Sequence, residues 1–152
     1  MGIISAFLLA PPLFLQLPAR SQGASPRDLI QSGVDAYIKS GPSAAFSAWF
    51  KGTFTEKNIQ SKLQADDLSN TLKTLDAEYG ALEGFDVIFD LNVGARARLL
   101  YIILYYGKGT AYAYFEALKL KSGDWIMLQL VINTKPSEVI PTTLLPRLPA
   151  AQ

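Results

Sequence analysis

The residues best suited to chemistry are Glu116, Tyr101 and Tyr114, which lie in a run of alternating residues between Gly84 and Thr134. A carboxylate in an apolar neighbourhood can have its pKa raised until it acts as a general base, and tyrosine hydroxyls can donate to a developing oxyanion. Such a trio would suit a small isomerase or hydrolyase that acts on an apolar ligand. A Glu among polar neighbours on the outer face of a sheet is the commoner arrangement, so we expect no catalytic residues and favour binding.

Composition excludes several other kinds of site. The 152 residues include no Cys and no His, which rules out disulfides, thiolate or imidazole nucleophile systems and zinc held by those ligands. Lys and Arg number 14 against 13 Asp and Glu, for a net charge of +1, and no long basic run is present. A nucleic-acid binder needs a basic patch, so we expect no nucleic-acid partner. We also expect no cofactor.

Two arginines at alternate positions, Arg96 and Arg98, could clamp an anionic ligand through their forked donors. Arginines spaced in this way more often lie at a solvated sheet edge or pair with neighbouring carboxylates. Asp90 and Glu83 are the expected partners.

Acidic and glycine-rich motifs are present but weak. Asp66 and Asp67, like Asp86 and Asp90, lack the dense oxygen-ligand spacing of a calcium loop, so we expect no metal site. The sequence Gly107-Lys108-Gly109 resembles a fragment of a phosphate loop, yet it lies between two predicted strands and precedes no helix. We interpret it as a hairpin turn.

The amino terminus predicts export. Ile3–Leu17 is a short apolar stretch broken by Pro11 and Pro12, and it is shorter than the about 20 residues that a membrane-spanning helix needs. Small residues at Ala19 and Ser21 suit cleavage after Ser21. We therefore interpret residues 1–21 as a signal peptide of a periplasmic or secreted protein with no stable membrane anchor after cleavage.

Helical periodicity follows this segment. Apolar spacing predicts a helix over 27–39, a second short helix capped by Ser43 and ended by Gly52, and a longer one that opens at Glu56 and closes at Gly80.

Past Gly84 the period changes to two, which is typical of strands. Four strands are predicted over 85–91, 97–106, 111–120 and 125–134, and the short turns between them make neighbouring strands antiparallel. Helices followed by strands indicate an α+β fold with three N-terminal helices packed on one face of a curved four-stranded antiparallel sheet. We expect one domain over 22–140 and a Pro-rich, extended or disordered tail over 141–152.

Turn lengths give a trial register. It sets Tyr101 opposite Glu116, Glu116 opposite Gln129 and Asp86 opposite Tyr101. In this register the helix-side face is almost wholly apolar and includes Phe89 and Leu128.

The opposite, outer face mixes aromatic rings with polar tips. We predict that it is a binding or self-association surface, with a homodimer through the sheet face or an apolar small ligand as its partner, because aromatic and Met side chains are enriched at interface cores. The predicted binding residues are Tyr101, Tyr105, Tyr112, Tyr114, Glu116, Trp125, Met127 and Gln129.

The segment from Tyr79 to Pro141 resembles a group of small exported bacterial proteins of uncharacterised function. The resemblance rests on 79–85 (YGALEGF), Tyr105-Tyr106, 123–125 (GDW) and 133–138 (NTKPSE). It implies an NTF2-like, cystatin-like α+β fold, in which helices pack into a curved antiparallel sheet. That superfamily includes ketosteroid-isomerase-like enzymes, dehydratases and non-catalytic binding modules, so the resemblance by itself does not choose among functions.

Overall fold

The computed structural model describes residues 25–53 and 59–147, with side chains described for 25–53 and 66–146. The predicted signal peptide, the predicted helix start at Glu56 and the last residues of the predicted tail lie outside these ranges. The amino-terminal residue of the mature protein would test the first of these predictions. The elements are α1 (Pro26–Ser40), α2 (Pro42–Trp49), α3 (Ile59–Tyr79), β1 (Leu82–Val93), β2 (Ala97–Tyr106), β3 (Gly109–Lys119), β4 (Trp125–Asn133), η2 (Pro136–Glu138) and η3 (Leu145–Arg147).

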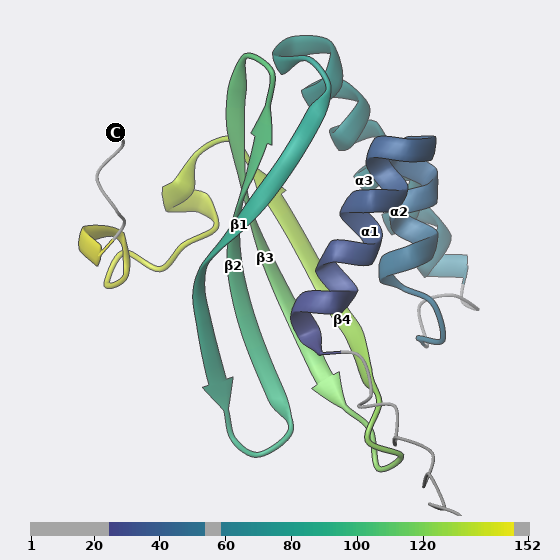
Figure 1. The fold of residues 1–152 in the computed structure, drawn as a ribbon, viewed down its shortest axis with the longest axis vertical. Coiled ribbons are helices and arrows are strands. Elements are labelled where there is room, and N and C mark those ends of the chain that lie inside the picture. The colour runs from purple at the N-terminus through teal and green to yellow at the C-terminus, as the bar shows by residue number, and fades with distance from the viewer. Residues whose placement is uncertain (1–24, 54–58, 148–152) are drawn as a thin grey trace, which may run out of the picture.

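The predicted α+β architecture is confirmed. Three helices cover one face of a curved antiparallel sheet whose strand order is β1-β2-β3-β4 (Figure 1). Each strand follows its neighbour through a short turn, so β1 and β4 are the two edges. Within the described ranges, no helix is long and apolar enough to cross a membrane.

Local sequence signals explain where the helices begin and end. Ser25 and Asp28 form a capping box at the start of α1, with Pro26 in the first turn. Gly41, at φ 84°, ends α1 and directly precedes α2, so the predicted capping role of Ser43 is wrong. α2 ends at Trp49, before the predicted stop at Gly52, and Gly80 follows α3 as predicted.

The observed register corrects two of the three predicted cross-strand pairs. Glu116 lies opposite Gln129, as predicted. Tyr101, however, lies opposite Tyr114 on β3 and opposite Phe89 on β1, so its predicted pairing with Glu116 and with Asp86 is wrong. The β2–β3 turn is Gly107-Lys108, which confirms the hairpin interpretation of this glycine-rich motif.

Two β-bulges also exchange the faces of several side chains. In β1 the register shifts between Val87 and Phe89, which moves Phe89 to the outer face beside Tyr101. In β4 it shifts between Gln129 and Met127. Met127 is therefore buried on the helix side, and Leu128 is 42% exposed, the reverse of the prediction for both residues.

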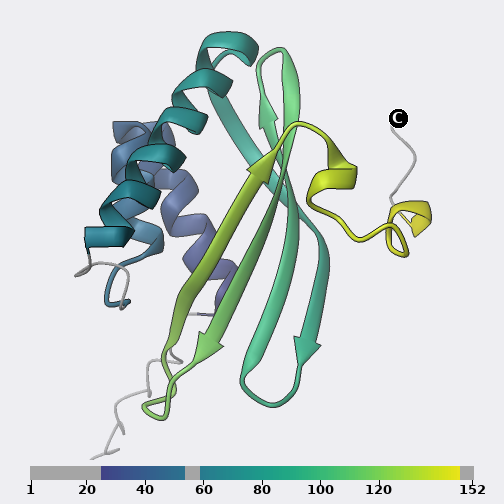
Figure 2. The same ribbon diagram turned by 180° about the vertical axis from the view of Figure 1, so that it is seen from behind.

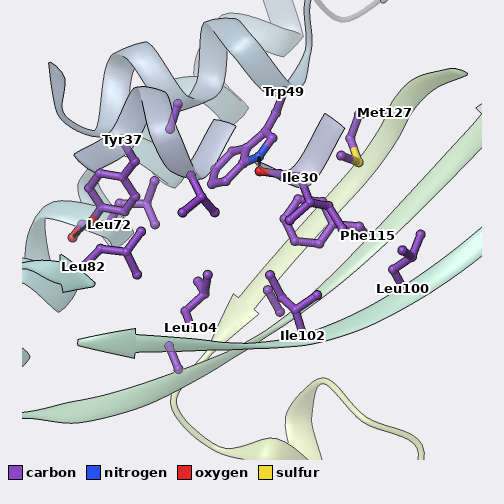
Figure 3. Close-up of a cluster of buried hydrophobic side chains, with 14 of the residues drawn as sticks. Ile30, Tyr37, Trp49, Leu72, Leu82, Leu100, Ile102, Leu104, Phe115 and Met127 are labelled. Atoms are coloured by element: carbon purple, nitrogen blue, oxygen red, sulfur yellow. Dashed lines mark hydrogen bonds between the residues drawn. The ribbon is translucent and has the colours of Figure 1, made fainter. Parts of the chain in front are cut away.

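The core lies between the helices and the sheet and centres on Trp49 (Figure 3). Its indole N–H donates to the Ile30 carbonyl at 3.1 Å, and its ring packs edge-on against Phe115 with the ring centroids 5.5 Å apart. The ring also lies directly over Gly33, where an added Cβ would come within 1.9 Å of the indole Nε1. A glycine in α1 is thus what allows α1 and α2 to approach closely.

The C-terminal segment returns along the face of the sheet that is turned away from the helices (Figures 1 and 2). It contains the two short helices η2 and η3 and is therefore not an extended end as far as Arg147. Ile140 in this segment is 1% exposed and Tyr101 on the outer face is 5% exposed, and both lie outside the helix-side core. The outer face therefore has a small buried cluster of its own.

We expect Gly33→Ala to destabilise the protein by about 3 kcal/mol, because the new methyl group forces the Trp49 ring out of its site. An exposed helical glycine would behave in the opposite way, since Ala is favoured over Gly by about 1 kcal/mol in a helix. Urea unfolding measures the change. The matched control is Gly84→Ala, where an added Cβ meets nothing within 4 Å; equal stability of the two variants would contradict the prediction.

Candidate functional site

A cleft of about 490 Å³ runs along the free side of β4, between this strand and helices α2 and α3. We call it the β4 cleft. Figure 2 shows α3 and β4 on the same side of the molecule. The cleft is lined by Phe46, Phe50, Asp67, Leu68, Thr71, Glu116, Leu128, Gln129, Leu130, Val131 and Ile132.

The helical wall of the β4 cleft is aromatic and aliphatic. Phe46 and Phe50 lie one turn apart along α2 and its C-cap, with stacked rings whose centroids are 4.7 Å apart. Leu68 adds an aliphatic surface from α3. Phe50 is 6% exposed, whereas Phe46 and Leu68 are only partly buried and leave apolar surface open to the cleft.

The strand wall is the uncharged edge strand β4, whose sequence is WIMLQLVIN. Among the described residues it pairs with β3 on one side only, so within that part of the chain no strand pairs with the backbone groups on its other side. Leu128 and Val131 are 42% and 36% exposed. The bulge produces the first of these exposures, because it takes Leu128 out of the row that faces the core.

Acidic groups supply the charge of the β4 cleft. Asp67 on α3 and Glu116 on β3 are the charged residues among its described lining. The Tyr114 hydroxyl donates to Glu116 Oε2 at 3.4 Å, and Gln129 lies opposite Glu116 on β4. Burial, followed by the charge of Glu116, raises the pKa of Tyr114, so this hydroxyl keeps its proton as a donor.

The predicted catalytic trio is only partly brought together. Glu116 and Tyr114 are neighbours on the outer face of β3, but the Tyr101 ring lies tilted against the Tyr114 ring, with the centroids 5.3 Å apart, instead of lying opposite Glu116. Burial raises the pKa of Tyr101. Its buried ring packs edge-on against the Phe89 ring in the outer cluster, with the two ring centroids 6.3 Å apart.

The remaining predicted binding residues divide between the two faces. Tyr105 is 37% exposed on the outer face and donates to Asp86 Oδ2 at 3.1 Å, and Tyr112 lies half-buried on the same face. Trp125 and Met127 pack with the helix-side core, so their predicted place on the outer face is wrong. The Lys119 ammonium lies 5.9 Å from the Trp125 ring centroid.

The predicted weak sites are engaged in structural contacts. Arg98 forms an ion pair with Asp90, as expected, and its Nε donates to Asp90 Oδ1 at 2.8 Å. Arg96 Nε donates to the Lys119 carbonyl at 2.8 Å. Within the described residues, no group of acidic side chains is arranged to hold a metal ion.

The sequence interpretation missed the helical wall. Phe50 is a core residue and Phe46 packs against the core, as their apolar helical spacing suggests, but both also line the β4 cleft, and nothing in their spacing indicates this second role. The absence of any charge in the last strand of a four-stranded meander is the signal that could have identified the open edge.

A second hollow of about 400 Å³ lies beside the end of α1 and is lined by Tyr37, Ile38, Gly41, Asp76, Ala81 and Leu82. The Tyr37 hydroxyl lies 2.9 Å from the Leu72 carbonyl oxygen and 3.0 Å from Asp76 Oδ1, so these two acceptors share its single proton. Burial, followed by the neighbouring Tyr106 and Asp76, raises the pKa of Tyr37. We interpret the Tyr37 hydroxyl and its acceptors on α3 as a polar contact that holds α1 against α3.

Tyr106, on the core face of β2, has a buried hydroxyl that neighbours the Tyr37 hydroxyl, but within the described ranges no group meets it in regular hydrogen-bond geometry. Burial raises the pKa of Tyr106 from 10.0 to about 12. The folded state therefore holds this proton more tightly than the unfolded chain, so its effect on stability is constant below pH 10 and becomes destabilising as the pH rises toward 12.

No family model matches this chain, and neither the curated proteins nor the solved structures contain a match to it. The functional argument therefore depends on the geometry of the site.

We expect Tyr37→Phe to lower the free energy of unfolding by about 1–2 kcal/mol at pH 7, because a hydrogen-bonded hydroxyl stabilises the folded state. We expect Tyr106→Phe to raise the free energy of unfolding by about 1 kcal/mol, because a buried hydroxyl without a hydrogen bond destabilises the folded state. Urea unfolding at pH 7 and pH 11 checks both changes. Tyr106→Phe should also flatten the loss of stability above pH 10. A destabilised Tyr106→Phe protein would show that the hydroxyl has a partner after all.

Proposed function

We propose that the protein is an exported, non-catalytic binding module that takes apolar ligands in the β4 cleft. One observation carries this proposal: a hollow of about 490 Å³, lined by apolar side chains with polar groups among them, lies beside an exposed, uncharged edge strand. Small-molecule sites typically occupy about 300–1,000 Å³ and combine apolar side chains with polar groups that orient the ligand. Asp67, Glu116 and Gln129 supply such polar groups here.

The β4 cleft suits this role better than the Tyr-rich outer face. Tyr101 is 5% exposed, and the C-terminal segment already occupies part of that side of the sheet. Tyr105 and Tyr112 remain accessible there, and pairing of two copies through this face stays a prediction.

For the fold, we propose the NTF2-like, cystatin-like arrangement that the sequence resemblance implies. Three helices against a curved four-stranded meander support this assignment. For localisation, we propose that the protein is exported, because residues 1–21 contain a short apolar segment followed by small residues.

We expect Leu128→Lys to weaken binding of the uncharged apolar dye Nile red by roughly tenfold, because the substitution puts a charge on the wall of the β4 cleft. Fluorescence titration measures the affinity. Leu128 is 42% exposed, so the fold should tolerate the change.

The matched control for Leu128→Lys is Val93→Lys. Val93 is 52% exposed at the far end of β1 and gains the same charge away from the β4 cleft. Dye binding that is equal in the two variants, or absent from the unmodified protein, would contradict the proposed function.

A second candidate is the small isomerase or hydrolyase with Glu116 as general base. It is favoured by one observation, the presence of Glu116 with its Tyr114 hydrogen bond in the lining of the β4 cleft. Against it, Tyr101 lies outside the hydrogen-bonded pair, and the space between helices and sheet is filled by Trp49 and Phe115 instead of forming an enclosed cone. Binding is therefore the preferred function.

The proton-abstraction probe 5-nitrobenzisoxazole separates these two functions, because it opens when a base removes its ring proton. A binding module predicts equal rates for the unmodified protein and Glu116→Gln. A general base contributes about a hundredfold or more to rate, so a fall of that size in the variant would support the enzyme. Binding of Nile red by the same variant controls for the integrity of the cleft.

A further inference from the structure

We propose that the β4 cleft binds an extended peptide that carries basic residues and adds to the sheet as a fifth strand beside β4. This inference rests on the proposed function and names the partner class of the same site. In this mode of recognition the main chain supplies hydrogen bonds and the pockets beside the strand select alternate side chains.

The two edges of the sheet differ in a way that selects β4. β1 carries Glu83, Asp86 and Asp90 and has two register shifts, both of which are features that discourage edge pairing. β4 has no charged residue in nine positions and only one register shift. β4 is therefore the edge strand that is more regular and uncharged, and an added strand would pair with it more favourably than with β1.

The helical wall supplies what an added strand needs on its inward side. A strand beside β4 sends alternate side chains toward the helices and toward the outer face. On the helix side these side chains would meet Phe46, Phe50 and Leu68, the apolar wall of the cleft. The partner is therefore expected to have apolar residues at alternate positions.

Charge decides between a foreign peptide and a second copy of this chain. The charged residues in the described lining are Asp67 and Glu116, both acidic. Pairing β4 with β4 of a second copy would bring two such acidic clefts together, whereas a Lys or Arg at the centre of a peptide would lie beside Gln129, the β4 residue opposite Glu116. The occupant that fits is a basic, extended peptide.

The probe is a blocked nine-residue peptide, equal in length to β4, of alternating threonine and valine with a lysine in place of the central threonine, which would lie beside Gln129. We expect it to bind and to protect β4 amides from hydrogen exchange while leaving β1 amides unchanged. A matched peptide with glutamate in place of the lysine should bind roughly tenfold more weakly. Glu116→Gln should weaken the lysine peptide and leave unchanged the binding of a version with threonine at the central position.

Backbone pairing is tested separately from apolar contact. N-methylation of alternate valines removes main-chain donors and keeps the side chains, so it should abolish peptide binding while Nile red still binds. Equal binding of the methylated and unmodified peptides would overturn strand addition.

Three further outcomes distinguish failure of the peptide inference from failure of the proposed function. Loss of dye binding in Leu128→Lys with no binding of any peptide would leave the proposed function in place and overturn the peptide inference. A dimer by light scattering, with β4 amides protected in the absence of peptide, would identify a second copy as the occupant and also overturn it. Dye binding that is indifferent to Leu128→Lys would reject the proposed function itself.

Discussion

The close approach of Trp49 to Gly33 is the contact on which the arrangement of helices and sheet depends. With no side chain at Gly33, the indole lies against the backbone of α1, and its far edge reaches Phe115 on the sheet. One side chain thus ties two helices and a strand together. It also fixes the rotation of α2, and with Trp49 turned inward, Phe46 and Phe50 turn toward β4. A constraint in the core therefore builds the wall of the candidate site.

The sequence predicts elements well where the signals are local. Apolar spacing and Gly or Pro punctuation place β2 at Ala97–Tyr106 and end α3 before Gly80. The faces of the strands are less predictable, since a strand has period two and one inserted residue inverts everything beyond it. The bulges beside Phe89 and Leu128 each do this, and neither contains a glycine or proline that would announce it.

The candidate site illustrates the same division. The predicted pairing of Glu116 with Gln129 is observed, but not because the turn is placed correctly. Beside the β3–β4 turn Lys119 lies opposite Trp125, one residue from the predicted register, and the bulge next to Glu116 restores the predicted pairing. The helical wall of the cleft is not predictable from the sequence. Phe46 lies about 80 residues before Gln129 in the chain, and its apolar spacing fits a core position equally well. Which apolar face of a short helix meets the core is decided by tertiary packing, and here by the fit of Trp49 over Gly33.

An open sheet has two edge strands, and in this protein the two differ in charge and in regularity. At β1, three carboxylates and an irregular backbone make pairing with another chain unfavourable. At β4 an uncharged strand stays exposed beside apolar helix residues, with Glu116 and Asp67 as the charged groups in the described lining of the cleft. If exposure at β4 were merely tolerated, uncontrolled pairing with other copies would be the expected cost. The acidic rim opposes that pairing and leaves the edge open to a basic strand, so the same two carboxylates serve both solubility and selectivity.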